Sequence, residues 1–193
     1  MLERQVANMK SLILASGSPR RKEILEQVGL AFRITPSDVE EVITKQVPSD
    51  IVMELSRQKA EDVYAKCVAE EVIVLGADTV VAYGGKILGK PADEADAAKM
   101  LRMLSGNVHS VFTGVTLVSD QGTVSFYEET EVEFYEMSEE EIQGYIASGE
   151  PMDKAGSYGI QGKAAAFIKG IRGDYYNVVG LPVARVLKNL QKM

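Results

Sequence analysis

The stretch SLILASGSPRRKEILEQVG, residues 11–29, decides the fold. Its apolar opening, Ser11–Ala15, is typical of a short buried strand. Ser18 suits a helix N-cap, Pro19 suits the first helical position, and Gly29 suits the C-terminal stop. A buried strand that passes through a tight turn into a helix predicts an α/β fold, and the rest of the chain extends that pattern.

Further strands and helices alternate along the chain, with hairpins among them. We expect strands at Ala31–Thr35, in KIL after a Gly84–Gly85 turn, at Ser110–Val118 and at Thr123–Glu136, and a buried pair of strands in VIVLGADTVVAY (72–83). We expect helices from Pro48 to about Ala69, from Asp93 to Ser105, from a capping box at Ser138 to Gly149 and from about Pro182. The intruding hairpins predict a mixed sheet with flanking helices. No repeat or linker is visible, so residues 11–193 should form one domain after an N-terminal extension, residues 1–10.

The composition excludes several classes of protein and site. The 193 residues carry 21 Lys and Arg against 28 Asp and Glu, a net charge of −7, which argues against nucleic-acid binding through a broad basic face. One Cys excludes a disulfide framework and suits a reducing cytosol, and one His excludes a histidine-rich metal site. No stretch reaches the roughly 20 apolar residues of a membrane helix. A metal would need carboxylate ligands, which favours Mg²⁺ or Mn²⁺.

The turn SGSPRRK, residues 16–22, breaks a local electrostatic rule. A helix N-terminus carries partial positive charge, yet Arg20, Arg21 and Lys22 fill the first turn. Free backbone N–H groups, the hydroxyls of Ser16 and Ser18 and two guanidiniums together describe a phosphate cradle. The alternative is a solvated basic turn.

Two charged residues lie among apolar ones. Lys59 shares a helix face with Val52, Leu55 and Val63, so it either snorkels to solvent or pairs with an anion. Asp78 ends the buried run VIVLGA, where a carboxylate is costly unless it is paired, hydrogen-bonded or bound to a metal. We therefore expect Asp78 to be functional, with an Asx turn as the alternative.

Other candidates are less specific. Lys90 follows the hairpin, and Asp153, Lys154 and Gln161 lie in a glycine-rich stretch of backbone donors. The pair Glu40 and Glu41 offers carboxylates, although surface solvation is the commoner fate of such a pair. His109 has no Ser–His–Asp spacing around it, which favours a structural hydrogen bond over catalysis.

Six ordered motifs together resemble a known family. LILASGSPRR, GADTVV, LGKP, LSGNVHSVFTG, EPMDKAGSYGIQG and GDYYNVVGLP run from Leu12 to Leu187 and strongly resemble the Maf family of nucleoside triphosphate pyrophosphatases. The resemblance implies an elongated mixed α/β fold with two lobes around a central cleft, similar to the inosine triphosphate pyrophosphatases. It also implies Mg²⁺- or Mn²⁺-dependent hydrolysis to monophosphate and pyrophosphate, and often a homodimer.

The resemblance also assigns roles to residues of this chain. It implies metal ligation by Asp78 and by one of the two glutamates, Glu41 in preference to Glu40, and a proton acceptor at Asp78. It implies specificity for dTTP and UTP through Arg20, Thr79 and Gln161. The residues that it implies for substrate binding are Ser16, Ser18, Arg20, Arg21, Lys59, Lys90 and Lys154. Gln161 can donate and accept, so it would fit the O4 and N3–H edge of uracil.

The expected function is therefore cytoplasmic hydrolysis of dTTP, UTP and modified pyrimidine nucleotides. The alternative that the family suggests is a nucleotide-binding regulator that inhibits septum formation in cell division. Nucleotidyl transfer to an acceptor would use the same phosphate chemistry. A buried carboxylate at Asp78 distinguishes catalysis from binding, because binding alone needs only the cations.

Overall fold

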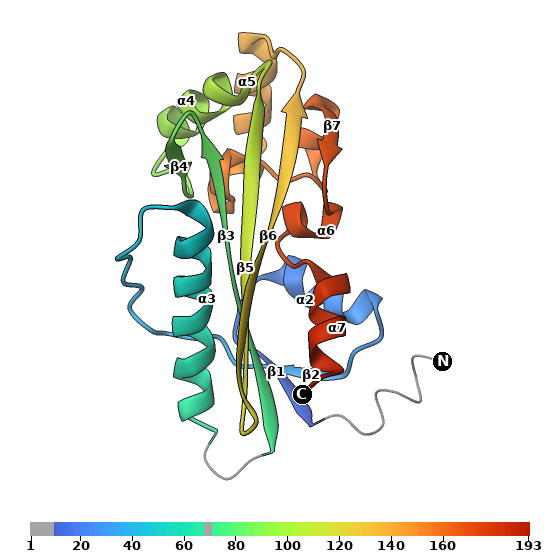
Figure 1. Ribbon diagram of the computed structural model, residues 1–193. Coiled ribbons are helices and arrows are strands. Elements are labelled where there is room, and N and C mark those ends of the chain that lie inside the picture. The colour runs from blue at the N-terminus through green and yellow to red at the C-terminus, as the bar shows by residue number, and fades with distance from the viewer. Residues whose placement is uncertain (1–9, 68–70) are drawn as a thin grey trace. The chain divides into compact units, whose positions relative to one another are not determined.

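The computed structural model describes residues 10–67 and 71–193, and within them the strands form one seven-stranded mixed sheet (Figure 1). Its order is β2-β1-β3-β5-β6-β7, with β4 paired to β3. The elements are β1 (Ser11–Leu14), α2 (Pro19–Gln27), β2 (Phe32–Ile34), α3 (Pro48–Ala65), β3 (Val72–Tyr83), β4 (Lys86–Leu88), α4 (Glu94–Leu104), β5 (Val108–Ser119), β6 (Gly122–Phe134), α5 (Glu139–Ile146), η1 (Glu150–Asp153), η2 (Ala155–Ser157), η3 (Lys163–Phe167), β7 (Ile168–Arg172), α6 (Tyr175–Val179) and α7 (Val183–Leu190).

The sheet confirms the predicted mixed α/β class. Strand β1 pairs in parallel with β2 and β3, whereas β4 and β7 pair antiparallel with β3 and β6. Gly84 and Gly85, both with positive φ, make the predicted turn between β3 and β4. In β6, Phe126, Val132 and Phe134 are buried while the residues of the opposite phase are exposed or half-buried, so one face of this strand packs on the core.

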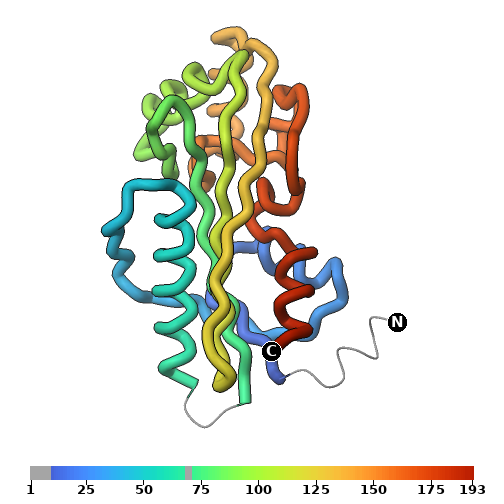
Figure 2. The backbone as a smooth tube through the Cα atoms, viewed as in Figure 1, coloured from blue at the N-terminus to red at the C-terminus, as the bar shows by residue number. Residues whose placement is uncertain are grey.

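The chain divides into two compact units, and β3, β5 and β6 each contribute residues to both. The first unit comprises residues 1–78, 113–128 and 180–193. In it, α3 covers one side of the strands, while α2 and α7 lie on the other side (Figure 2). A core cluster joins β1, α3, β3 and β5, with Ile13, Val63 and Val74 almost fully buried.

Two small residues let α3 approach the sheet closely. A Cβ at Gly76 would lie 2.2 Å from the carbonyl oxygen of Ser56, and one at Gly114 would lie 2.2 Å from that of Val52. Ser56 shares a 2.9 Å hydrogen bond with Thr116 of β5, buried below the helix. The backbone of α3 therefore contacts the backbone of β3 and β5 directly, which places the side chains of α3 beside the middle of β3, where Asp78 lies.

The second unit comprises residues 79–112 and 129–179 and has its own core. Leu101 and Leu104 of α4, Phe134 of β6 and Ile142 of α5 are buried in it. The predicted caps are both present: Asp93 accepts from the backbone of Asp96, and Ser138 forms a capping box with Glu141.

Several boundaries differ from the expectations. VIVLGADTVVAY is one continuous strand, and α3 ends at Ala65, whereas the predicted helix end at Ala69 lies outside the described residues. Strand β7 was not predicted, because Ile168–Arg172 is a short edge strand whose apolar residues alternate weakly. Residues 1–9 of the predicted extension are outside the described part, and one domain over 11–193 stays a prediction.

Candidate active site

The basic turn predicted to bind phosphate lies at the start of α2, in the first unit. Ser18 occupies the N-cap position and Pro19 begins the helix, as expected, but the Ser18 side chain makes no capping hydrogen bond. The turn is instead organised through Ser16, whose hydroxyl oxygen accepts from the Ser18 backbone N–H at 3.3 Å. With no acidic side chain in the first turn, the helix terminus keeps its attraction for an anion.

Arg21 is fixed in place by two elements of the first unit. Its Nε donates to the carbonyl oxygen of Gly180 at 2.8 Å, and its Nη1 donates to Ser16 Oγ at 3.0 Å. Burial lowers the pKa of Arg21, while the charge of Asp78, and to a lesser degree that of Glu41, raises it. Two hydrogen bonds and two carboxylates thus hold a cationic guanidinium near Asp78 before any ligand arrives, and Arg20 adds like charge beside it.

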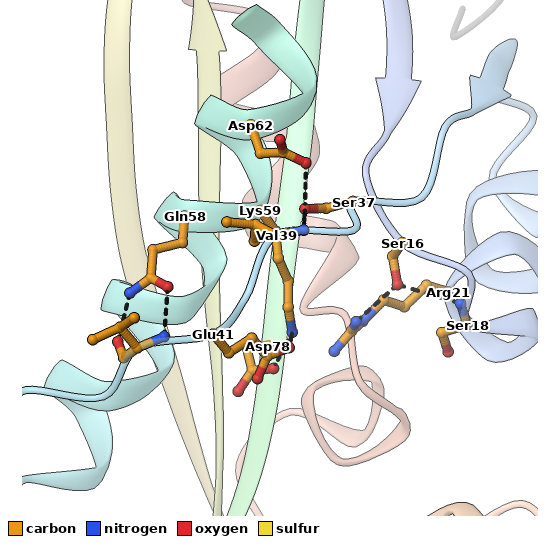
Figure 3. Close-up of polar contacts among 11 residues, drawn as sticks. Ser16, Ser18, Arg21, Ser37, Val39, Glu41, Gln58, Lys59, Asp62 and Asp78 are labelled. Carbon is orange, nitrogen blue, oxygen red and sulfur yellow. Dashed lines mark hydrogen bonds and ion pairs between the residues drawn. The ribbon is translucent and has the colours of Figure 1, made fainter. Parts of the chain in front are cut away.

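Lys59 joins the two predicted metal ligands. Its Nζ lies 2.6 Å from Asp78 Oδ1 and 2.9 Å from Glu41 Oε1. In Figure 3, Lys59 comes from α3, Asp78 from β3 and Glu41 from the loop before α3, and Arg21 extends toward the same cluster from α2. The Lys59 and Asp78 side chains are only 17% and 14% exposed, so the ammonium compensates the cost of burying that carboxylate.

The two ion pairs of Lys59 show which predicted alternative holds for its side chain and which of the two glutamates faces it. Lys59 pairs with anions rather than snorkelling to solvent, since its ammonium contacts the shielded carboxylate of Asp78 and the more exposed carboxylate of Glu41. The glutamate that reaches Lys59 is Glu41, the second of the two exposed neighbours Glu40 and Glu41. The expectation that Asp78 ends its strand is wrong, because β3 continues through it to Tyr83, and this excludes the Asx turn. Its carboxylate instead accepts a hydrogen bond from the Lys59 ammonium.

The chemistry of these donors fits a hard divalent cation. Glu41 and Asp78 each place a carboxylate oxygen within hydrogen-bond distance of the Lys59 ammonium. The two carboxylates therefore already stabilise one positive charge between them. Among the described residues there is no group of three or more His, Cys, Asp or Glu side chains that could hold a metal. Two carboxylates suit Mg²⁺, which usually completes its coordination with water and substrate phosphate.

Two more predicted cations belong to the second unit. Lys154 Nζ donates to the Glu150 carbonyl oxygen at 2.7 Å and to Asp153 Oδ1 at 2.6 Å, and its side chain is 15% exposed. Lys90 is exposed on the stretch after β4. The backbone N–H of Gly156 donates to the carbonyl oxygen of Gly89 at 3.0 Å, so the structure brings together the two segments that carry these lysines.

The two predicted specificity residues of this unit differ in their surroundings. Thr79 follows Asp78 on β3, so its side chain points to the opposite face of the strand. Gln161 is exposed on a tight turn in which the backbone of Gly162 donates to Gly159. A glutamate that the sequence analysis missed holds this turn: Glu150 accepts from Lys163 N at 3.0 Å, and a Cβ at Gly162 would fall 2.0 Å from its carboxylate oxygen.

His109 has the structural role that the sequence predicts. It is buried, and its Nε2 shares a 2.7 Å hydrogen bond with the hydroxyl of Tyr158. Its ring packs edge-on against Phe134 and Tyr158 at centroid distances of 5.0 and 5.3 Å. Burial lowers the pKa of His109 to about 4, so the imidazole is neutral at physiological pH.

Comparison with known proteins places this site in a family context. The family model described as "Maf-like protein" matches residues 11–193. The dTTP/UTP pyrophosphatase of Agathobacter rectalis is 57% identical over 96% of this chain and 98% of its own length. The dTTP/UTP pyrophosphatase of Bacillus cytotoxicus is 58% identical over 95% of this chain and 96% of its own length.

Solved structures give a weaker likeness. The nucleoside-triphosphatase (dITP/XTP pyrophosphatase) of Mycobacterium abscessus is 14% identical with a TM-score of 0.38, over 64% of this chain and 72% of that one. The Ham1 protein of Staphylococcus aureus is 16% identical with a TM-score of 0.42, over 65% of this chain and 72% of that one. Among the described helices, none is both long enough and apolar enough to cross a membrane.

Proposed function

The chain belongs to the Maf-like protein family, and on that premise we propose that it is a nucleoside triphosphate pyrophosphatase that hydrolyses dTTP and UTP, and modified pyrimidine nucleotides, to the monophosphate and pyrophosphate. Its relatives at 57–58% identity over nearly their whole length carry that activity in their names. At this similarity the catalytic reading is favoured over a regulator of septum formation.

One observation carries the chemistry of the proposal, which is the convergence of Lys59, Asp78, Glu41 and Arg21 in one unit. Arg21, with Arg20 and the backbone at the start of α2, would bind the phosphate chain and offset charge that develops in the transition state. Asp78 would orient a water molecule and accept its proton as the oxygen attacks the α-phosphorus. The bond from that phosphorus to the bridging oxygen then breaks, and pyrophosphate leaves.

We propose that Glu41 and Asp78 hold a divalent cation, Mg²⁺ or Mn²⁺, together with the substrate. Such an ion, when bound, polarises phosphoryl oxygens and lowers the pKa of bound water. Lys59 occupies the position between these carboxylates in the free protein, so a second cation there requires Lys59 to turn toward the phosphate chain. The Glu41 side chain is 47% exposed, which leaves room for Lys59 to move away and a cation to enter.

We propose that Arg20, Thr79 and Gln161 recognise the base. Lys90 and Lys154 would bind the phosphate chain together with the arginines. Gln161 suits an edge that both accepts and donates, which uracil and thymine offer and cytosine reverses. A Gln161→Ala variant should lose its preference for UTP over CTP. Unchanged discrimination by that variant would remove Gln161 from the specificity set.

The test of the proposed function is a panel of nucleoside triphosphates with Mg²⁺ or Mn²⁺, in which pyrophosphate and monophosphate are both measured. We expect dTTP and UTP to be preferred and Asp78→Asn to lose at least 100-fold in kcat, since a positioned general base supplies about 10²–10⁴-fold. Pyrophosphate release at the level of Asp78→Asn would leave only a binding function. Pyrophosphate without free monophosphate would indicate nucleotidyl transfer.

The remaining expectations concern location and partners. We propose that the protein acts on the nucleotide pool of the cytoplasm and does not bind nucleic acid, which its net charge of −7 supports. A homodimer stays a prediction from the resemblance, and sedimentation equilibrium would test it.

A further inference from the structure

The segment that carries Glu41 has neither helix nor strand. Residues 35–46, between β2 and α3, form no ladder with the sheet. Val42, Ile43 and Val47 in and beside this segment are 54–57% exposed, so little apolar packing fixes its position. Some other interaction must therefore decide which of two consecutive glutamates faces Lys59.

Polar side chains of α3 bind the segment at a spacing of four residues, which places them on one helix face. We call this set the α3 ladder: Glu54, Gln58 and Asp62 of α3 together with Lys66, the residue that caps its C-terminus. Glu54 accepts from Thr44 N at 2.9 Å and from its hydroxyl at 2.5 Å, Asp62 accepts from the Ser37 hydroxyl at 2.7 Å, and Lys66 pairs with Asp38. These bonds from Thr44 and Ser37 lower the pKa of Glu54 and of Asp62.

Gln58 is the member of the α3 ladder nearest to the site, and it binds backbone alone. Its Oε1 accepts from Val42 N at 3.0 Å, and its Nε2 donates to the Val42 carbonyl oxygen at 2.6 Å (Figure 3). The Val42 N–H belongs to the peptide group that Glu41 shares, so this bond fixes the direction in which the Glu41 side chain leaves the chain. Adjacent helix residues thus meet adjacent loop residues, Gln58 with Val42 and Lys59 with Glu41.

We propose that Gln58 is a positioning residue that sets the register of this segment, so that Glu41 and not Glu40 faces Lys59 and Asp78. A slip of one residue would put Glu40 at that position and turn Glu41 outward. The inference rests on the proposed function, because it assigns Gln58 a role in metal binding through Glu41. Removing a side chain that orients a metal ligand typically weakens metal binding about 10–100-fold.

The test compares Gln58→Met, which keeps the length and loses both hydrogen bonds, with Gln143→Met as a matched control. Gln143 also lies on an exposed helix face and bonds a side chain, Glu139, in the second unit. In the full chain without nucleotide, Mn²⁺ binding is measured from the resonance signal of the free ion. We expect the Kd to rise about tenfold in Gln58→Met and to be unchanged in Gln143→Met.

The same substitution in a Glu41→Gln background separates positioning from general support of the fold. If Gln58 acts through Glu41, Gln58→Met should cause no further loss of Mn²⁺ affinity in that background. An equal loss in both backgrounds, or wild-type affinity in Gln58→Met, overturns the proposal. Gln58→Glu, which keeps the acceptor but repels the Val42 carbonyl, is a second variant with the same expected loss.

Hydrogen exchange distinguishes failure of this inference from failure of the proposed function. The peptide spanning residues 40–44 should exchange at least tenfold faster in Gln58→Met than in the wild type, whatever the reaction. Unchanged exchange overturns the role of Gln58 even if the enzyme is active. A wild type that binds no Mn²⁺ and releases no pyrophosphate overturns the proposed function, and the role in metal binding with it.

Discussion

Replacing Gly76 by alanine tests whether close packing of α3 on the sheet positions the site. A Cβ at this position would lie 2.2 Å from the Ser56 carbonyl oxygen, 2.8 Å from Ala60 N and 2.9 Å from Ala60 Cβ. All three atoms lie on the body of α3, where no flexible side chain can move aside. The helix itself must therefore move away from β3, and Lys59 moves with it.

The size of the effect follows from these distances. Real Cβ contacts below 3.0 Å essentially do not occur, so the Ser56 carbonyl must retreat by about 1 Å, and overpacking of this kind costs about 1–3 kcal/mol. We expect a value at the upper end, because backbone atoms have to move. For a chain of this length, about 3 kcal/mol corresponds to a fall in Tm of roughly 6–12 °C. A shift of about 1 Å at Lys59 would also cost on the order of 100-fold in kcat/KM.

Urea and thermal unfolding measure the stability, and pyrophosphate release from dTTP measures the catalytic effect. Gly144→Ala is the matched control, because Gly144 lies inside α5 and a Cβ there meets no atom within 4 Å. That control should gain about 0.5–1 kcal/mol from the better helix propensity of alanine. If Gly76→Ala unfolds within 0.5 kcal/mol of the wild type and keeps its kcat/KM, the packing argument is wrong.

Three further outcomes are expected. Arg21→Lys should raise the KM for nucleotide about tenfold with little loss of Tm, because an ammonium cannot reproduce the guanidinium fork, and an unchanged KM would exclude Arg21 from phosphate binding. The wild type should lose about 3 kcal/mol of stability as the pH falls from about 6.5 to 4, since unfolded His109 binds a proton that the buried ring, with its pKa of about 4, does not. His109→Gln should unfold with a flatter pH profile over that range, and an identical profile would show that other groups dominate. Chelation of divalent ions should abolish pyrophosphate release, with recovery on adding Mg²⁺ or Mn²⁺, and activity that survives chelation would contradict the metal assignment.

Much of the fold could be predicted from the sequence where local signals dominate. Ser18 and Pro19 mark the start of α2, Ser138 and Glu141 form the predicted capping box, and the Gly84–Gly85 pair makes the predicted turn. Each of these signals depends on residues within one turn of helix or one hairpin. The edge strand β7 was missed because its pairing with β6 comes from a distant segment and not from its own weak pattern.

The polar spacing on α3 was a signal that could have been read from the sequence. Glu54, Gln58, Asp62 and Lys66 recur every four residues, beside the apolar face that predicts the helix. Such a row is ordinarily a solvated face, so its role appears only when the segment that it binds is placed beside it. Glu150 is similar, because its contacts with the turn around Gly162 span more than ten residues.

By itself, the sequence determined the mixed α/β class, the basic turn at Arg20 and Arg21, and the two isolated charges Lys59 and Asp78, because each breaks or follows a local rule of charge and periodicity. The tertiary structure alone decided that Lys59 pairs instead of snorkelling and that Glu41, not Glu40, reaches it. Both choices depend on how closely a helix packs on bare strand backbone and on the register of a segment without secondary structure. Those distances are set by contacts between parts of the chain far apart in sequence, which no local pattern encodes.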